Sequence, residues 1–265
     1  MTQQVLLSRR DGAVLVLTNN NPAARNALSP EFYAALTEAL AAAAADPGVG
    51  AVVLTGEGAH FCSGGDLRVL ARRRELPVEE RRNKIQGLHD LIRAVRDFPK
   101  PVIAAVEGAA AGAGLSLALA CDMVVAARDA MFSMAYIKVG LTPDGGATAF
   151  LAEFMSRQIL TELCLTGDRL TGERMHALGV INRLTEPGQA LAQAMQLAGQ
   201  VADGPELATA RIKSLCRVAY GNTLDEQLEQ EIAFMVRSQE TEESREGISA
   251  FLEKRSPDFA GLRAR

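Results

Sequence analysis

The feature that most constrains the fold is an apolar, strand-like run that leads into residues with almost no side chain, and it occurs twice. The first copy reads GAVVLTG and then HFCSGGDL, ending at Leu67. The second reads KPVIAAVEG and then GAAAGAGLSLALACD, ahead of a third apolar run, DMVVAA. A helical pattern follows directly after the second turn, and after a polar stretch in the first. Strands and helices that alternate at this spacing predict parallel β-α-β units and an α/β fold.

The N-terminal segments predict a hairpin and then a helix. VLLSRR and AVLVLT flank a turn at Asp11 and Gly12, as in a β-hairpin. Ser29 followed by Pro30 predicts a helix start, since the hydroxyl can cap free amides and proline fits the first turn. The Asp-Pro pair that begins at Asp46 predicts the helix end.

The C-terminal part of the sequence is almost entirely helical in pattern. A charged, amphipathic stretch from about Pro77 to Phe98 predicts an earlier helix, and from about Gln189 onward few strand signals occur. We therefore expect a core at residues 1–188 that carries the site, and a helical assembly region at 189–265.

Composition excludes several classes of function. The 265 residues carry a net charge of -4, and the 28 basic residues are dispersed or paired with acids, so no nucleic-acid partner is expected. The basic run Arg72–Arg74 precedes Glu75 and further acids, which favours a solvated helix face. No apolar run approaches ~18 uninterrupted residues, so we expect no membrane partner and a soluble, cytoplasmic protein. The four cysteines are widely spaced, which favours reduced core residues over a disulfide framework or a metal cluster.

The two small-residue turns suggest a site built from main-chain amides. Missing side chains let a ligand approach backbone N–H groups closely, and helix N-termini favour negative charge. Two such turns that face one another could bind a single oxygen as an oxyanion hole, in which each donor contributes ~100 to 1,000-fold in rate. The alternative is that the small residues serve only close helix–sheet packing.

Five stretches, in order and spacing, resemble one enzyme family. They are NPAARNALS, HFCSGGDL, KPVIAAVEGAAAGAGLSLALACDMVVA, FSMAYIKVGLTPDGGAT and EGISAFLEKRSPDFAG. Over nearly the whole chain the sequence resembles the crotonase superfamily, also called the enoyl-CoA hydratase/isomerase family. The resemblance implies a ClpP/crotonase-like spiral of ββα units with a C-terminal helical trimerisation region. It also implies a homotrimer or a dimer of trimers, an acyl-CoA thioester as substrate, and no metal or cofactor beyond the coenzyme A of the substrate.

The resemblance also implies roles for particular residues. The thioester oxygen would be held by the amides of Gly65 and Ala113, where most relatives carry Gly at the second position. Asp66 is interpreted as an acid that fixes its loop through local hydrogen bonds. The segments that cradle coenzyme A would be the bend at Ala23, Ala24 and Arg25 and the run through Ser63, Gly65, Asp66 and Leu67, with Tyr136 nearby.

The absence of two glutamates expected in a hydratase reduces the number of reactions that the chain could catalyse. The resemblance implies that hydratases of this family use two glutamates to position a water and deliver its proton. The corresponding positions here are Ser116 and Tyr136. Neither a hydroxyl nor a phenol is a competent base near neutral pH, so hydration by the two-glutamate route is not expected. Asp144, in GLTPDGGAT, is similar in position to the carboxylate of some isomerases and of an aryl-CoA dehalogenase in the family.

The prediction is therefore double-bond isomerisation of an enoyl-CoA with Asp144 as acid and base. The alternatives are an enoyl-CoA hydratase, a non-catalytic CoA-binding protein, and Asp144 acting only as a helix cap. A dinucleotide site at GAAAGAG lacks the third glycine of GxGxxG. A serine hydrolase built on Ser116 lacks a suitably placed histidine, and dehalogenation lacks an aromatic wall, since the chain has no Trp.

Overall fold

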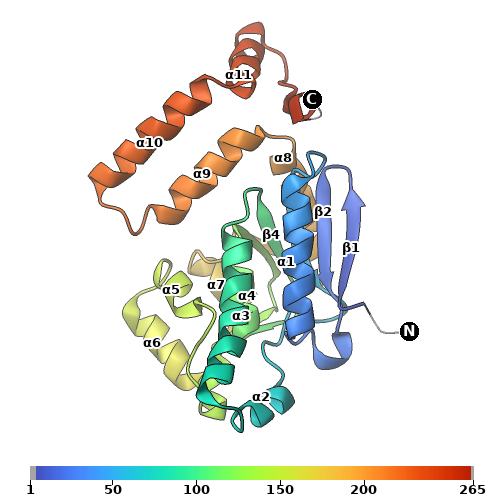
Figure 1. The fold of residues 1–265 in the computed structure, drawn as a ribbon, viewed down its shortest axis with the longest axis vertical. Helices are drawn as coiled ribbons and strands as arrows, with labels where there is room; N and C mark the ends of the chain where they lie inside the picture. Colours follow the sequence, from blue (N-terminus) through green and yellow to red (C-terminus); the bar gives the residue numbers. More distant parts are fainter. Residues whose placement is uncertain (1–3, 264–265) are drawn as a thin grey trace.

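The computed structural model describes residues 4–263, whose strands form two sheets. The larger sheet has the order β1-β2-β3-β4-β6-β9, and the smaller has the order β5-β7-β8 (Figure 1). In the larger sheet β1 pairs with β2 in antiparallel register, and the pairings from β2 to β9 are parallel. The predicted hairpin and α/β class are therefore confirmed. The strands are β1 Leu6–Asp11, β2 Val14–Asn19, β3 Ala51–Gly56, β4 Val102–Val106, β5 Ala109–Ala111, β6 Met123–Ala127, β7 Met131–Ser133, β8 Arg169–Thr171 and β9 Arg183–Thr185.

The helices cover the sheets and extend the chain beyond them. The predicted start at Ser29 is confirmed, because its side chain accepts a 3.2 Å hydrogen bond from Phe32 N. The predicted end is confirmed as well, with Asp46 at the C-cap. The helices are α1 Pro30–Ala45, α2 Leu67–Arg73, α3 Val78–Arg96, α4 Ala113–Leu119, α5 Ala147–Ala152, α6 Arg157–Thr166, α7 Gly172–Ala177, α8 Ala190–Ala202, α9 Glu206–Val218, α10 Leu224–Gln239, α11 Glu242–Glu253 and α12 Phe259–Arg263, with 3-10 turns η1 Pro22–Ala24 and η2 Ala135–Val139.

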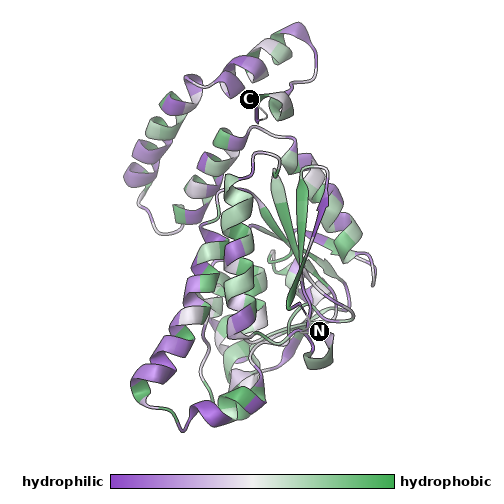
Figure 2. Ribbon diagram, turned by 45° about the vertical axis from the view of Figure 1, so that its right-hand side comes forward, coloured by the Kyte–Doolittle hydropathy of each residue, from purple (hydrophilic) through white to green (hydrophobic). Residues whose placement is uncertain are grey.

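Alternate residues of the central strands pack on opposite faces of the larger sheet. On β3, Val52 and Leu54 join the core that α1 and α3 close, whereas Val53 joins the core that α8 closes. Figure 1 shows α1 and α3 side by side over the strands, and Figure 2 shows that the strands between the layers are predominantly hydrophobic. A parallel sheet buried on both faces explains why the strand sequences are continuous apolar runs.

The last helices project away from the sheets (Figure 1). They expose many large apolar side chains, and Figure 2 shows hydrophobic and hydrophilic positions alternating along them. α8, which follows residue 188, packs on the larger sheet. The division at residues 188 and 189 stays a prediction. The exposed apolar residues of α9 to α11 and their connections are Leu207, Ile212, Tyr220, Leu224, Leu228, Ile232, Met235, Val236, Ile248, Phe251 and Leu252.

A partly buried lysine attaches the projecting helices to the core. Lys213 of α9 donates 2.7 Å hydrogen bonds to the carbonyl oxygens of Phe98 and Lys100, and its Nζ lies 2.6 Å from the carboxylate of Asp122. Asp122 in turn accepts a 2.7 Å hydrogen bond from Val102 N at the start of β4. The position of α9 is therefore set by polar contacts to the end of a central strand.

Three local expectations are corrected by the structure. α2 begins at Leu67, directly after the first small-residue turn, where the sequence pattern predicted a polar stretch. Arg73, in the basic run, is partly buried, so that run is not a wholly solvated face. All four cysteines are free, but Cys216 is exposed and is not a core residue.

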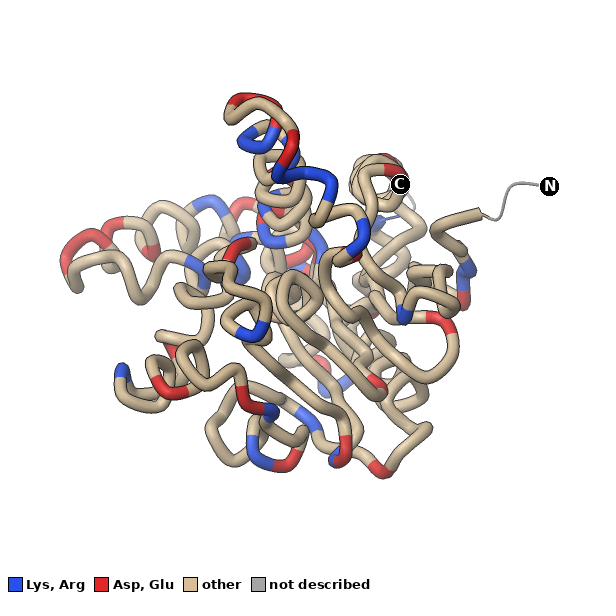
Figure 3. The backbone as a smooth tube through the Cα atoms, turned by 90° about the horizontal axis from the view of Figure 1, so that it is seen from below, with Lys and Arg blue, Asp and Glu red and all other residues tan. Residues whose placement is uncertain are grey.

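Charged residues of both signs are distributed over the described part of the chain. Figure 3 shows basic and acidic residues interspersed along the backbone. Among residues 4–263, no helix is both long enough and apolar enough to span a bilayer.

Candidate active site

The two small-residue turns lie against each other. Cys62 pairs with Ala110 in an isolated parallel bridge, and Ala111 N donates a 3.0 Å hydrogen bond to Cys62 O. Gly64 has a φ of 88°, and a Cβ there would lie 2.6 Å from Ala111 O and 3.3 Å from Ala113 N. The close approach of the two turns therefore requires glycine at position 64.

The two amides expected to hold the thioester oxygen are unoccupied by protein acceptors. Ala113 is the first residue of α4, so its N–H has no partner within the helix. Within residues 4–263, no acceptor binds the N–H of Gly65 or of Ala113. Gly65 is exposed, whereas Ala113 is buried. Neither N–H group is therefore occupied by a described part of the protein, and that of Gly65 belongs to a residue at the surface.

The bend at residues 23–25 is joined to the first turn by hydrogen bonds. Ser63 N donates to Arg25 O over 3.0 Å, and the Ser63 hydroxyl donates to Ala24 O over 3.2 Å. Leu28 N donates to Gly64 O over 2.8 Å. Arg25 itself has a φ of 52° and an exposed side chain. The residues predicted to cradle coenzyme A are thus brought together around one edge of the turn, with Ala23 in η1.

Asn26 is a positioning residue that the sequence patterns did not single out. Its side chain is fully buried and donates to the carbonyl oxygens of Glu57 and His60, over 2.9 Å and 2.6 Å. Its Oδ1 accepts from Asn21 N over 2.9 Å. One amide side chain thereby fixes the bend against the segment that enters the first turn. No periodic pattern indicates this role, because the two carbonyl groups that accept hydrogen bonds from the side chain, those of Glu57 and His60, lie more than 30 residues away.

Asp66 fixes the loop that contains Gly65. It is the N-cap of α2, and its Oδ1 accepts a 2.8 Å hydrogen bond from Arg68 N. This is a local hydrogen bond of the kind expected for Asp66. The neighbouring Leu67 is 57% exposed.

Asp144, Tyr136 and Ser116 form one hydrogen-bonded group. The Tyr136 hydroxyl donates a 2.7 Å hydrogen bond to Asp144 Oδ1, and the buried Ser116 hydroxyl donates a 3.0 Å hydrogen bond to Asp144 O. A Cβ on Gly112, beside Ala113, would lie 3.5 Å from Cζ of Tyr136. The phenol therefore lies between the second turn and the carboxylate.

The protonation state of Tyr136 follows from its surroundings. Burial, and then the negative charge of Asp144, raise the pKa of Tyr136 far above its ordinary value. The phenol is consequently neutral at physiological pH and donates a hydrogen bond to the carboxylate.

Asp144 does not cap the following helix. α5 begins at Ala147, its N-cap is Gly146, and no side chain forms a hydrogen bond to this cap. The alternative that Asp144 acts as the helix cap is therefore wrong. One carboxylate oxygen, Oδ1, is bound by Tyr136, and no protein donor binds Oδ2 within the described residues.

Tyr33 of α1 is a second phenol within electrostatic reach of Asp144, and the sequence patterns did not indicate it. Burial raises the pKa of Tyr33 to about 12, Arg73 lowers it, and Asp144 and Cys62 raise it further. The phenol thus lies within electrostatic reach of the first turn, of the carboxylate and of α2. The sequence pattern gave no sign of this, because a tyrosine at position 33 is also what a partly buried position of an amphipathic helix commonly carries.

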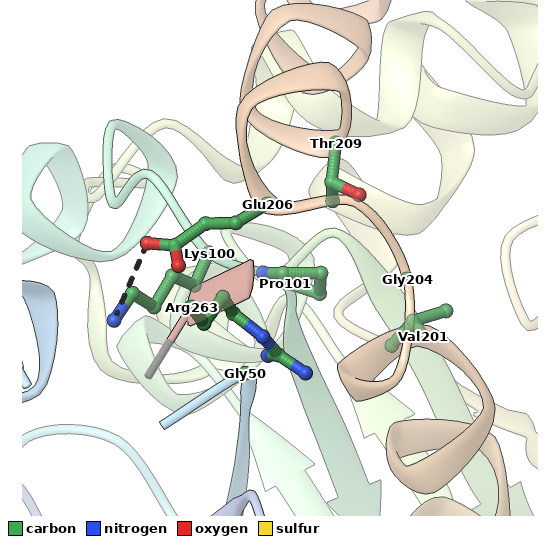
Figure 4. Close-up of a pocket in the computed structure, with 8 residues that line it drawn as sticks. All are labelled: Gly50, Lys100, Pro101, Val201, Gly204, Glu206, Thr209 and Arg263. Atoms are coloured by element: carbon green, nitrogen blue, oxygen red, sulfur yellow. Dashed lines mark ion pairs between the residues drawn. The ribbon is translucent and has the colours of Figure 1, made fainter. Parts of the chain in front are cut away.

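Two hollows in the structure are lined by residues other than Ser116, Tyr136 and Asp144. A groove of about 340 Å³ separates α1 from α3 and is open to solvent next to Tyr33. A cavity of about 10 Å³ lies under α9 and is bordered by the Lys100–Glu206 ion pair of 3.6 Å (Figure 4). The latter has room for about one water molecule and no substrate. The groove is lined by Pro30, Tyr33, Glu80, Asn83, Lys84 and Gly87.

Within residues 4–263, no cluster of three or more His, Cys, Asp or Glu side chains could bind a metal ion. The expectation that the protein uses no metal stays a prediction.

Comparisons with known proteins match nearly the whole chain to one family. The family model described as Enoyl-CoA hydratase/isomerase matches residues 9–262. The 1,2-epoxyphenylacetyl-CoA isomerase of Escherichia coli (strain K12) is 38% identical over 97% of this chain and 99% of its own length. The 2,3-dehydroadipyl-CoA hydratase of the same organism is 36% identical over 97% of this chain and 98% of its own length. The crystal structure of an enoyl-CoA hydratase from Polaromonas sp. JS666 has a TM-score of 0.93 at 49% identity, and covers 95% of this chain and 98% of its own.

The fold and the extent of these matches define an acyl-CoA enzyme of the isomerase or lyase type. The chain belongs to the enoyl-CoA hydratase/isomerase family, the crotonase superfamily. The resemblance, the crotonase-like fold and the acyl-CoA thioester substrate expected from the sequence are thereby confirmed.

Proposed function

We propose that this protein isomerises the double bond of an enoyl-CoA, with Asp144 as the group that moves the proton. The observation that carries the proposal is the state of the Asp144 carboxylate. It is bound by the phenol of Tyr136 through one oxygen, and it does not cap α5. A carboxylate in this state has a second oxygen available to accept a proton from carbon.

The amides of Gly65 and Ala113 would bind the thioester oxygen. Their N–H groups have no protein acceptor, and the turns that carry them are in contact through Gly64. As negative charge gathers on that oxygen, the C2 proton of a 3-enoyl-CoA becomes removable. Asp144 takes this proton, and the electron pair forms the C2–C3 double bond. As the C3–C4 double bond is lost, Asp144 returns a proton to C4, and in deuterated water this is a deuteron wherever the carboxyl group has exchanged with the solvent.

Ser116 and Tyr136 support isomerisation over the two-carboxylate route of hydration. Both groups are hydroxyls that donate hydrogen bonds to Asp144, and neither is a carboxylate that could serve as a second base for water. Hydration is kept as the second candidate, because several relatives are named as hydratases. In that reaction Asp144 would be the single carboxylate that activates water.

The test uses 3-hexenoyl-CoA and 2-hexenoyl-CoA as separate substrates in deuterated water. An isomerase converts the first into the second and places deuterium at C2 or C4, which mass spectrometry detects. A hydratase converts the second into a product heavier by one water. Neither rearrangement nor exchange with either substrate would contradict both candidates and favour a non-catalytic CoA-binding protein.

Two variants assign the chemistry to Asp144. Asp144→Asn should abolish rearrangement while the affinity for a saturated acyl-CoA changes little, because the amides of the oxyanion hole remain. Asp168→Asn, an exposed acid, is the matched control and should retain wild-type turnover. Wild-type turnover by Asp144→Asn would overturn the proposal and direct attention to Tyr136 with a bound water.

We also propose a homotrimer or a dimer of trimers, which uses no cofactor beyond the coenzyme A of the substrate. The apolar side chains exposed on α9 to α11 support assembly through these helices. Light scattering on the purified protein would give the number of subunits. The cytoplasmic location stays a prediction.

A further inference from the structure

Three residues of α2 and its cap face the protein, and Arg73 is the last of them. Asp66, Leu70 and Arg73 are partly buried, whereas the other residues from Leu67 to Arg74 are exposed. The three are spaced by four and three positions, which places them on one face of a helix. A Cβ on Gly65 would lie 3.3 Å from Cδ1 of Leu70, so this face covers the turn that carries the Gly65 amide. Arg73 follows Leu70 by one helical turn, about 5 Å along the axis.

The Arg73 guanidinium has an unmet requirement for an acceptor. Its Nε is buried and has no hydrogen-bond partner, and it is the single buried side-chain N or O atom in this condition within residues 4–263. No carboxylate of the described chain lies within ion-pair distance of Arg73. A partly buried cation with an unbound donor is unfavourable by itself. A bound anion would supply both the missing opposite charge and the missing hydrogen-bond acceptor.

The same arginine acts on Tyr33, whose phenol is also within electrostatic reach of Asp144. Since burial raises the pKa of Tyr33 to about 12, this phenol is a neutral hydrogen-bond donor. A guanidinium and a phenol in the same region are the groups that bind a carboxylate well. Tyr33 is within electrostatic reach of Asp144, which in the proposed reaction acts on the carbons next to the thioester, so this region is suited to the acyl part of a substrate.

We propose that Arg73, with Tyr33, binds an anionic group at the far end of the acyl chain, so that the substrates are CoA thioesters of short dicarboxylic acids. The proposal rests on the proposed function, because it needs the thioester at Gly65 and Ala113. The distal carboxylate lies against α2, about one helical turn beyond Leu70, and this short reach selects chains of few carbons. The negative charge of Asp144 disfavours the distal carboxylate near the proton-transfer site and reinforces the orientation.

The charged residues of the adjacent groove do not provide this function. Glu80 and Lys84 both line it, at positions i and i+4 of α3, and both are exposed. Their opposite charges offset each other for a bound anion. Arg73 therefore distinguishes a charged acyl end from an uncharged one.

The experiment compares the binding of two saturated thioesters of equal length, adipyl-CoA and hexanoyl-CoA, by isothermal titration calorimetry. Neither is turned over, so the result does not depend on whether the enzyme is an isomerase or a hydratase. Wild-type protein should bind adipyl-CoA about 10-fold more tightly or better, as expected for a charge-assisted hydrogen bond in a partly buried site. Arg73→Met should abolish this preference, and Arg73→Lys should retain part of it.

Arg72→Met is the matched control, because Arg72 is exposed on the same helix. It should keep the preference for adipyl-CoA. The thermal unfolding midpoint of each variant shows whether it is folded. Adipyl-pantetheine and hexanoyl-pantetheine, which lack the nucleotide phosphates of coenzyme A, should show the same preference in the wild type.

Each other outcome overturns the proposal in a distinguishable way. Equal affinities of the wild type for both thioesters would overturn it and leave the proposed function intact. An equal loss of affinity for both in Arg73→Met, with no preference among the pantetheine esters, would assign Arg73 to the phosphates of coenzyme A. Failure of the wild type to bind either thioester would overturn the proposed function as well.

Discussion

The Tyr136 hydroxyl lies 2.7 Å from Oδ1 of Asp144 and donates a hydrogen bond to it. The resemblance to the family predicts a glutamate at position 136 in a hydratase, whereas this chain has a phenol there that donates a hydrogen bond. The donor orients the remaining carboxylate instead of acting as a second base. One carboxylate held by one phenol is suited to moving a proton between two carbons.

Removal of that phenol hydroxyl should impair turnover more than binding. In Tyr136→Phe the carboxylate loses a hydrogen bond to a charged group, and kcat should fall about tenfold with little change in KM. Steady-state kinetics with 3-hexenoyl-CoA checks this prediction. Tyr220→Phe, at a phenol that is 73% exposed, is the control and should be neutral. A rise in KM at constant kcat would instead assign Tyr136 to substrate binding.

The contact between the two turns should not tolerate a methyl group at position 64. In Gly64→Ala the new Cβ would lie 2.6 Å from Ala111 O, at a φ of 88° that disfavours alanine. Gly188→Ala is the matched control, because its φ is 80° and nothing lies within 4 Å of its Cβ position.

Both variants should lose about 1 to 3 kcal/mol of unfolding free energy from backbone strain, which denaturant titration measures. Gly64→Ala should lose more, and it should also lose acyl-CoA affinity as the amides move apart. Identical behaviour of the two variants would show that the turns are not held by this contact.

The attachment of α9 should depend on Lys213. Lys213→Met leaves the Asp122 carboxylate, whose side chain is 25% exposed, without its cation, and should reduce stability by about 3 kcal/mol. Arg217→Met, one turn later on α9, removes a surface ion pair to Asp97 and should cost at most about 1 kcal/mol. Thermal and denaturant unfolding of the two variants measure the difference. Equal effects would mean that burial does not set the strength of the Lys213 contact.

The C-terminal segment should loosen in acid. Side-chain hydrogen bonds from Arg255, and then a backbone hydrogen bond from Asp258 N, lower the pKa of Glu246 from 4.5 to about 2. Because the pKa is lower in the folded state, the stabilisation is complete above pH 4.5 and is lost as the pH falls towards 2.

The protection of the Asp258 amide against hydrogen exchange, measured relative to an unstructured peptide at the same pH, should therefore fall over that interval. Glu246→Gln should exchange rapidly at neutral pH, whereas Glu242→Gln, in the first turn of the same helix, should not. High salt should weaken the effect, because the pair is at the surface. Unchanged exchange at Asp258 in Glu246→Gln would contradict this account of the segment.

Some features of the site were predictable from local sequence because they depend on neighbouring residues. The small-residue turns, the Ser29 cap and the apolar strands follow from short-range sterics, hydrogen bonding and the burial of strands. The positions of Gly65, Ala113 and Asp144 were likewise predicted from the resemblance to the family. What these residues touch was not predictable in the same way.

Asp144 illustrates the limit. Asp before Gly-Gly-Ala is a good capping sequence, and a local argument cannot exclude that role. In the structure Gly146 is the cap residue, and a phenol eight positions earlier in the chain binds the carboxylate. A hydrogen bond from η2 to the segment before α5 therefore determines what the Asp144 carboxylate binds.

The sequence by itself determined the α/β class, the family and the residue types available for chemistry, because these depend on periodicity, on turn-forming residues and on motif order. Only the tertiary structure decided that Arg73 and Tyr33, 40 positions apart on α2 and α1, lie within electrostatic reach of each other. The physical reason is that helices with the same hydrophobic periodicity can pack against each other in many registers. The packing that forms determines which polar side chains become neighbours.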